Sequence, residues 1–126
     1  MPNSVTVLVA SDDAFELATL SAALRLQSIN VVAEASTDEI ADNLYKFLSP
    51  QVVLIDLQFS GAEALKLVNK FRKVNPSLGI VLMTACPDLR LLGLLEKQIP
   101  LGAKVILKKS IADLTVVSHA IVRSIA

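Results

Sequence analysis

The feature that most constrains the fold of this chain is a set of five short runs rich in Val and Ile, separated by longer segments. The runs are VTVLV from Val5, INVVAE from Ile29, QVVLI from Gln51, GIVLM from Gly79 and AKVIL from Ala103. Branched aliphatic side chains favour extended backbone, so each run predicts a β-strand. The first, third and fourth are almost continuously apolar, which is typical of strands covered by helices on both faces of a sheet.

The segments between these runs are amphipathic and of helical length. They predict helices over about residues 14–27, 37–48, 61–74, 88–98 and 111–125. Two of the helix starts, at 36–39 and 60–63, match the S-x-x-E capping box. Five β/α units with right-handed crossovers predict an α/β fold, a doubly wound five-stranded parallel sheet of the flavodoxin-like (βα)5 type with strand order 2-1-3-4-5. We expect one domain over residues 1–126.

Charge and hydropathy exclude some classes of partner. Lys plus Arg number 12 and Asp plus Glu number 12, so the chain has no net charge with which to attract a nucleic-acid backbone or an anionic membrane. No apolar run approaches the roughly 20 residues needed to cross a bilayer, and the first residues lack the pattern of a signal peptide. The lone Cys86 excludes an intramolecular disulfide. We therefore expect a cytoplasmic protein that binds neither nucleic acid nor membrane through this chain.

Polar residues gather where the predicted strands end. Ser11, Asp12 and Asp13 follow the first strand, Asp56 ends the third, Thr84 ends the fourth, and Lys108 and Lys109 follow the fifth. In an open α/β sheet, ligands bind outside the carboxyl ends of the strands near the point where strand order reverses. Neighbouring carboxylates repel each other unless a cation neutralises them, and Mg²⁺ is commonly held by one or two carboxylates plus waters and phosphate oxygens. A carboxylate in such a site can form an aspartyl-phosphate, with an ammonium and a hydroxyl stabilising the transferring oxygens.

Each of these residues also has a purely structural interpretation. Asp12 or Asp13 could cap the first helix, Thr84 could be an ordinary strand residue, and a strand-end lysine is commonly solvated. Asp56 fits a capping role poorly, because Ser60 already supplies a cap for the following helix. The combination at one edge of the sheet favours a phosphoryl-transfer site.

Four segments in order resemble the response-regulator receiver domains of the CheY-like superfamily over essentially the whole chain. VLVASDD resembles the first strand with its acidic pair, QVVLIDL the strand with the phosphoacceptor, VLMTA the strand with the switch hydroxyl, and GAKVILKKS the segment that carries the lysine. The stretch VVAEASTDEI and the final strand led by Gly-Ala are most similar to receivers of the NarL/LuxR type. In that group a DNA-binding domain usually follows, so the chain is either a stand-alone receiver or a receiver separated from such a domain.

The resemblance implies a phosphoacceptor switch in two-component signal transduction, not an enzyme of the ordinary kind, although it would catalyse its own phosphorylation and dephosphorylation. A sensor histidine kinase would be the phosphoryl donor, Mg²⁺ the cofactor, transcription regulation the output and a homodimer a further candidate assembly. The implied residues are Asp56 as phosphoacceptor, Thr84 and Lys109 as its catalytic partners, Asp12, Asp13, Asp56 and the Gln58 carbonyl as metal ligands, and Ala85 as the small residue that admits the phosphoryl group. Lys108 is the alternative to Lys109, since adjacent strand residues point to opposite faces.

The chain also departs from the family pattern. An ungapped match aligns the acidic pair with Ser11-Asp12, whereas a bulge in the first strand would restore Asp12-Asp13. Ile106 replaces the usual aromatic residue and Ser110 the usual proline after the lysine. Of these departures, Ser11 and Ile106 favour an alternative, a pseudo-receiver that binds a partner without phosphorylation. A flavin or nucleotide enzyme on the same fold is disfavoured, because the four glycines form neither G-x-G-x-x-G nor a P-loop.

Overall fold

A computed structural model of the chain describes residues 5–56, 61–84, 104–107 and 121–122. Five parallel strands form one sheet in the order β2-β1-β3-β4-β5. The strands are β1 Thr6–Ala10, β2 Asn30–Ala35, β3 Val52–Asp56, β4 Gly79–Thr84 and β5 Lys104–Leu107. The predicted strand positions and order 2-1-3-4-5 are confirmed, with β3 in the middle of the sheet.

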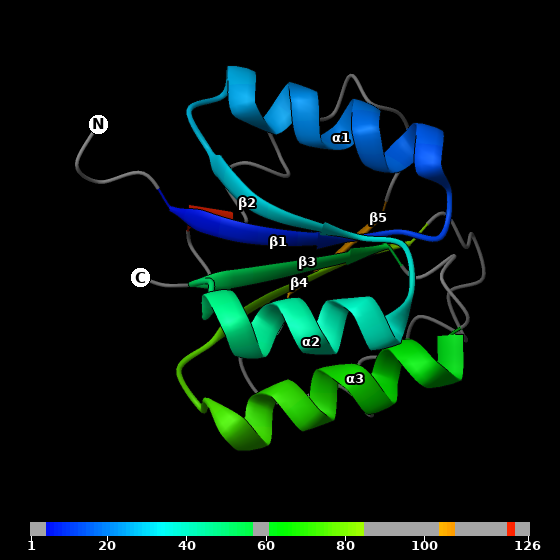
Figure 1. Cartoon of the computed structure of the whole chain (residues 1–126), viewed down its shortest axis with the longest axis vertical. Helices are drawn as coiled ribbons and strands as arrows, with labels where there is room; N and C mark the ends of the chain where they lie inside the picture. The colour runs from blue at the N-terminus through cyan, green and yellow to red at the C-terminus, as the bar shows by residue number, and fades with distance from the viewer. Residues whose placement is uncertain (1–4, 57–60, 85–103, 108–120, 123–126) are drawn as a thin grey trace.

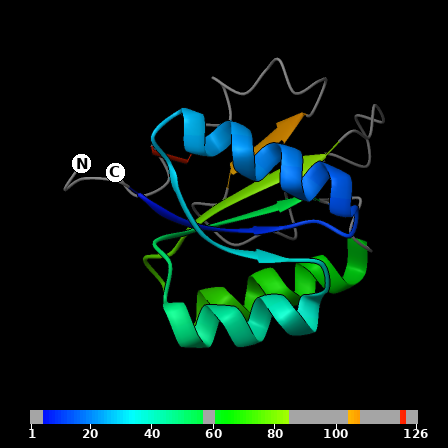
Figure 2. The same ribbon diagram turned by 45° about the horizontal axis from the view of Figure 1, so that its top comes forward.

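Three helices cover the two faces of this sheet: α1 Ala14–Leu26, α2 Asp38–Leu48 and α3 Gly61–Val74. Figures 1 and 2 show α1 on one face and α2 beside α3 on the other. The predicted helices at 88–98 and 111–125 lie outside the described residues, apart from helical residues 121–122. In the part of the chain that the structure describes, no helix is both long enough and apolar enough to span a bilayer.

Alternation along the strands produces two separate hydrophobic cores, one on each face of the sheet. On the α1 side, Val7, Val9 and Leu54 pack with Leu20 and Leu24 of the helix. The opposite core contains strand residues such as Leu8, Val53 and Ile80, and helix residues such as Tyr45 and Phe71. The middle strand β3 is buried along its whole length. Its nearly continuous apolar sequence is therefore explained by helices on both faces.

The edge strand β2 contains a bulge that the sequence did not reveal. Val7 pairs with Val31 but Leu8 pairs with Ala33, so Val32 is the extra residue. The bulge reverses the alternation, because Val31 packs in the α1-side core while Ala33 packs in the opposite core. Arg25 of α1 donates a hydrogen bond to the Val31 carbonyl at 3.4 Å. The same guanidinium lies 3.4 Å from a Glu34 carboxylate oxygen.

The start of α2 corrects one prediction. Thr37, not Ser36, is the N-cap: its backbone is extended, and its hydroxyl accepts the Ile40 N–H at 3.1 Å. The capping box expected at 36–39 is therefore wrong by one residue. The reason is that the sheet holds the chain through Ala35, whose carbonyl accepts the Ser11 N–H at 3.0 Å, so the turn into the helix occupies both following residues. The second expected box, led by Ser60, lies outside the described residues.

Candidate functional site

The carboxyl ends of β1 and β3 lie side by side. Ala10 of β1 is in register with Ile55 of β3, so Ser11 and Asp56 occupy the next position on the two strands. Both are almost fully buried, with 1% and 2% of their surface exposed. Burying a carboxylate is costly unless polar groups or a cation compensate it. A buried aspartate that ends the central strand therefore marks this edge as the candidate site.

Ser11 is tied into the junction between β1 and α1. Its backbone N–H donates to the Ala35 carbonyl, and its hydroxyl oxygen accepts the Asp13 N–H at 3.3 Å. The residue in the position of the usual first acid is therefore a buried hydroxyl with a structural role. This leaves a smaller negative charge at the site than two acids at these positions would give.

Asp13 is the N-cap of α1. Its Oδ1 accepts the N–H groups of Phe15 at 2.9 Å and Glu16 at 3.2 Å. Asp12, one residue earlier, is exposed and does not cap the helix. Of the two capping alternatives that the sequence left open, the structure thus shows the one with Asp13.

The register of β1 bears on which residues form the acidic pair. Residues 7–10 of β1 pair with 52–55 of β3 one by one, without a shift. The bulge between β1 and β2 places its extra residue, Val32, in β2 and not in β1. Within the described residues, β1 therefore contains no bulge that would move Asp13 into the place of Asp12.

The remaining predicted residues lie at the ends of β4 and β5. Asp56 pairs with Met83, so Thr84 is one residue further along β4. Thr84 in turn pairs with Leu107, the last residue of β5, which places the lysine pair directly after the strand in sequence. Ile106 belongs to β5 and pairs with Met83. Gln58, Ala85, Lys108, Lys109 and Ser110 lie outside the described residues.

The donor set at this edge suits a hard divalent cation held by few protein ligands. Among the described residues, no group of three His, Cys, Asp or Glu side chains is arranged to hold a metal ion. The carboxylates that follow these two neighbouring strand ends are Asp56, in the interior, and Asp12, exposed and one residue beyond Ser11. Mg²⁺ is commonly bound by one or two carboxylates, with waters and phosphate oxygens as the other ligands. The residues present therefore fit Mg²⁺ better than a metal that needs a complete protein cage.

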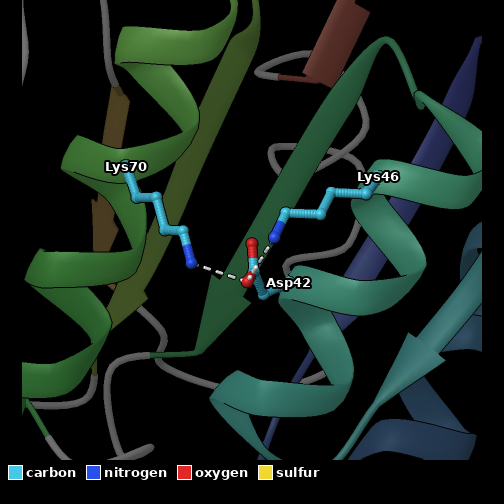
Figure 3. A network of polar contacts seen from close by, with 3 residues as sticks. All are labelled: Asp42, Lys46 and Lys70. Atoms are coloured by element: carbon cyan, nitrogen blue, oxygen red, sulfur yellow. Dashed lines mark hydrogen bonds and ion pairs between the residues drawn. The ribbon is translucent and has the colours of Figure 1, made fainter.

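A second charged group, which the sequence analysis did not single out, joins α2 to α3 (Figure 3). Asp42 Oδ2 lies 2.6 Å from the Lys70 ammonium and 3.3 Å from that of Lys46. The hydrogen bond from Lys70 is the main reason that the pKa of Asp42 lies below its ordinary value of 3.8. Asp42 and Lys70, but not Lys46, line a hollow of about 380 Å³ between the two helices. The i,i+4 spacing of Asp42 and Lys46 could have been recognised in the sequence. The contact between Asp42 and Lys70 of α3 could not, because the two residues are far apart in the chain.

Comparisons with known proteins agree with this fold. A solved structure of the signal receiver domain of the response regulator NarL from Mycobacterium tuberculosis is 26% identical, with a TM-score of 0.79 over 97% of this chain and 96% of that one. A response regulator receiver domain from Clostridium thermocellum shares 20% identity and a TM-score of 0.80, over 96% and 94% of the two chains. At that identity the likeness shows the fold alone.

A curated relative, a cyclic di-GMP phosphodiesterase from Thermotoga maritima, is 30% identical over 85% of this chain. The chain spans only about a quarter of the length of that relative (27%). The sequence profile of the response regulator receiver domain matches residues 7–121. That match runs from the second residue of β1 to beyond β5 and includes the acidic edge of the sheet, and it identifies the chain as a member of the response regulator receiver domain family.

Proposed function

We propose that this receiver accepts a phosphoryl group from a sensor histidine kinase on the Asp56 carboxylate, in a Mg²⁺-dependent reaction, and acts as a conformational switch. The observation that carries the proposal is the burial of Asp56, which is 2% exposed at the carboxyl end of the central strand. Its neighbours in β3 are aliphatic core residues, and a carboxylate buried among them needs compensating polar groups or a cation.

The proposed reaction assigns a role to each residue at this edge. An Asp56 carboxylate oxygen attacks the phosphorus of a phosphohistidine, the P–N bond breaks, and the imidazole of the kinase leaves. Asp12, Asp56 and the Gln58 carbonyl would hold Mg²⁺, with Asp13 as a weaker contributor because it also caps α1. Bound Mg²⁺ supplies positive charge beside the transferring oxygens. The Thr84 hydroxyl and one lysine ammonium after β5 stabilise the same oxygens.

Intact-mass measurement tests the proposal directly. The purified chain is incubated with Mg²⁺ and a small phosphodonor such as acetyl phosphate, and the mass gain of one phosphoryl group is followed. Asp56→Asn should abolish the gain while circular dichroism shows an unchanged fold. Labelling that survives in this variant would exclude Asp56 as the acceptor. A wild-type chain that is never labelled would instead favour the pseudo-receiver, which binds its partner without phosphorylation.

The same assay separates the two candidate lysines. The family count from Gly102-Ala103 selects Lys109, and side chains of adjacent strand residues point to opposite faces. Lys109→Ala should therefore slow labelling strongly and Lys108→Ala only weakly. The reverse order would show that the fifth strand is one residue out of the assumed register.

The resemblance of the second strand and of the final strand to receivers of the NarL/LuxR type supports an output in transcription regulation. A further structural neighbour is a DNA-binding response regulator of the LuxR family from Staphylococcus aureus, with a TM-score of 0.81 and 15% identity. The described chain itself is electrically neutral overall, so DNA contact would belong to an associated domain and not to this one.

A further inference from the structure

The solvent-facing side of α2 carries an apolar stripe. Ile40, Leu44 and Phe47 follow the i, i+4, i+7 spacing that places side chains on one helix face. Ile40 is 41% exposed and Phe47 is 85% exposed, while Leu44 is partly buried against the core. The core-facing side of the same helix is formed by Ala41 and Tyr45, both buried. We call Ile40, Leu44 and Phe47 the α2 stripe.

The α2 stripe lies at the outer side of the two-helix layer. Figure 2 shows α2 next to the edge strand β2, with α3 on its other side. The other large exposed apolar side chains of the described residues are more scattered: Phe15 and Leu26 lie at opposite ends of α1, Leu48 is the last residue of α2, Val74 is the last residue of α3, and Val122 lies near the end of the chain. Single exposed apolar residues are normal on protein surfaces, whereas a row of them along one helix marks a contact surface.

Two charges flank the α2 stripe in a self-complementary way. Glu39 and Lys46 are both exposed and lie seven residues apart, two helical turns, on the side of the stripe that borders α3, where Glu39 also lines the hollow with Lys66 and Lys70. In a pair of antiparallel helices related by a two-fold axis near Asn43, each Glu39 faces the Lys46 of the other copy. In the same arrangement, Ile40 of each copy packs against Phe47 of the other copy.

The present partner of Lys46 does not prevent this arrangement. The Lys46 ammonium lies 3.3 Å from Asp42 Oδ2, and the lysine side chain is 61% exposed. Asp42 keeps its shorter contact to Lys70, at 2.6 Å, when Lys46 turns outward. An exposed i,i+4 ion pair contributes little, so its loss does not oppose association strongly.

We propose that the α2 stripe is the contact surface for a second copy of this chain, with two α2 helices packed antiparallel about a two-fold axis. Such an interface is isologous, since the same patch serves both partners. One helix face per copy buries less than a standard interface, so the dissociation constant should be on the order of 10⁻⁵ to 10⁻³ M. The proposal concerns a surface separate from Asp56 and does not depend on phosphorylation.

Sedimentation velocity over a concentration series up to about 1 mM tests this association, because a constant in the expected range gives a shift from monomer to dimer within that window. Phe47→Glu should raise the dissociation constant by about tenfold or more. Phe15→Glu is the matched control, since Phe15 is 77% exposed on another helix and should leave association unchanged. A wild-type chain that stays monomeric throughout the series would overturn the proposal, as would equal weakening by the two variants.

Charge reversal tests the antiparallel geometry itself. Glu39→Lys and Lys46→Glu should each weaken association, because each places like charges against each other in both halves of the dimer. The double variant restores both pairs and should bring the dissociation constant back toward that of the wild type. Thermal unfolding of every variant separates loss of association from loss of fold. A double variant that associates no better than the single ones would refute the antiparallel arrangement.

Discussion

Replacing Asp13 with alanine removes the side chain that accepts two backbone N–H groups at the start of α1, those of Phe15 and Glu16. No other described side chain accepts these two groups, so in the variant they depend on water. Asparagine retains a side-chain oxygen in the same place and is as good an N-cap as aspartate. The pair Asp13→Ala and Asp13→Asn therefore separates the capping role from the negative charge.

The expected loss for Asp13→Ala is about 1 kcal/mol, within the range of roughly 0.5–2 kcal/mol for removing an N-cap. For a chain of 126 residues, an unfolding entropy of about 2.1 cal/mol/K per residue converts that loss into a fall in Tm of about 4 °C. Asp13→Asn should change Tm by about 1 °C or less, because only the weak attraction between its charge and the helix dipole is lost. Urea unfolding followed by circular dichroism measures both free energies.

Mg²⁺ titration of the asparagine variants completes the test. Asp12→Asn should weaken Mg²⁺ binding more than Asp13→Asn, because Asp12 is exposed and does not cap the helix, whereas Oδ1 of Asp13 is engaged by two N–H groups. Equal losses of affinity would instead assign both residues to the metal. An Asp13→Ala variant as stable as the wild type, or an Asp13→Asn variant as unstable as Asp13→Ala, would refute the capping argument.

Three further substitutions probe the helices that cover the opposite face. Asp42→Asn should lower the free energy of unfolding by about 1 kcal/mol at neutral pH. The pKa of Asp42 is lowered in the folded chain, mainly by Lys70, so the difference between wild type and variant should persist above pH 3.8 and vanish as the pH falls through the lowered pKa. Urea unfolding at several pH values measures this difference. Arg72→Met should destabilise the chain by about 1–2 kcal/mol, since Nη1 of Arg72 donates hydrogen bonds to the carbonyls of Pro76 at 2.7 Å and Leu78 at 2.6 Å. An unchanged midpoint of urea unfolding would contradict this. Phe71→Ala should cost about 3–5 kcal/mol, because this ring is 1% exposed in the core, and a loss below 1 kcal/mol would show that the core refills the space.

The sheet and the three described helices were predictable because their signals are local. Continuous apolar runs specify buried strands, and amphipathic periodicity specifies helices that cover them. The handedness of the crossovers and the number of β/α units then leave only a few doubly wound strand orders, of which 2-1-3-4-5 is a common one. The polar residues of the site could be placed for the same reason, since each stands at the end of an apolar run.

The details that the sequence did not settle depend on contacts between distant segments. Ser36 and Thr37 are both acceptable caps, and the choice of Thr37 follows from how far β2 is held in the sheet through Ala35. The bulge at Val32 likewise depends on pairing with β1 and on Arg25 from α1. The choice between Asp12 and Asp13 as the helix cap required the turn geometry around Ser11. Local patterns do not contain this information.

The bulge in β2 has a consequence for how copies of this chain can meet. An edge strand with regular, unpaired backbone groups is a template on which a further strand can add, and repeated addition leads to open-ended aggregates. Here the extra residue Val32 interrupts the repeat, and the Val31 carbonyl is already engaged by Arg25. The sheet therefore ends at β2, so that copies brought together through α2 form a closed pair instead of a growing fibre.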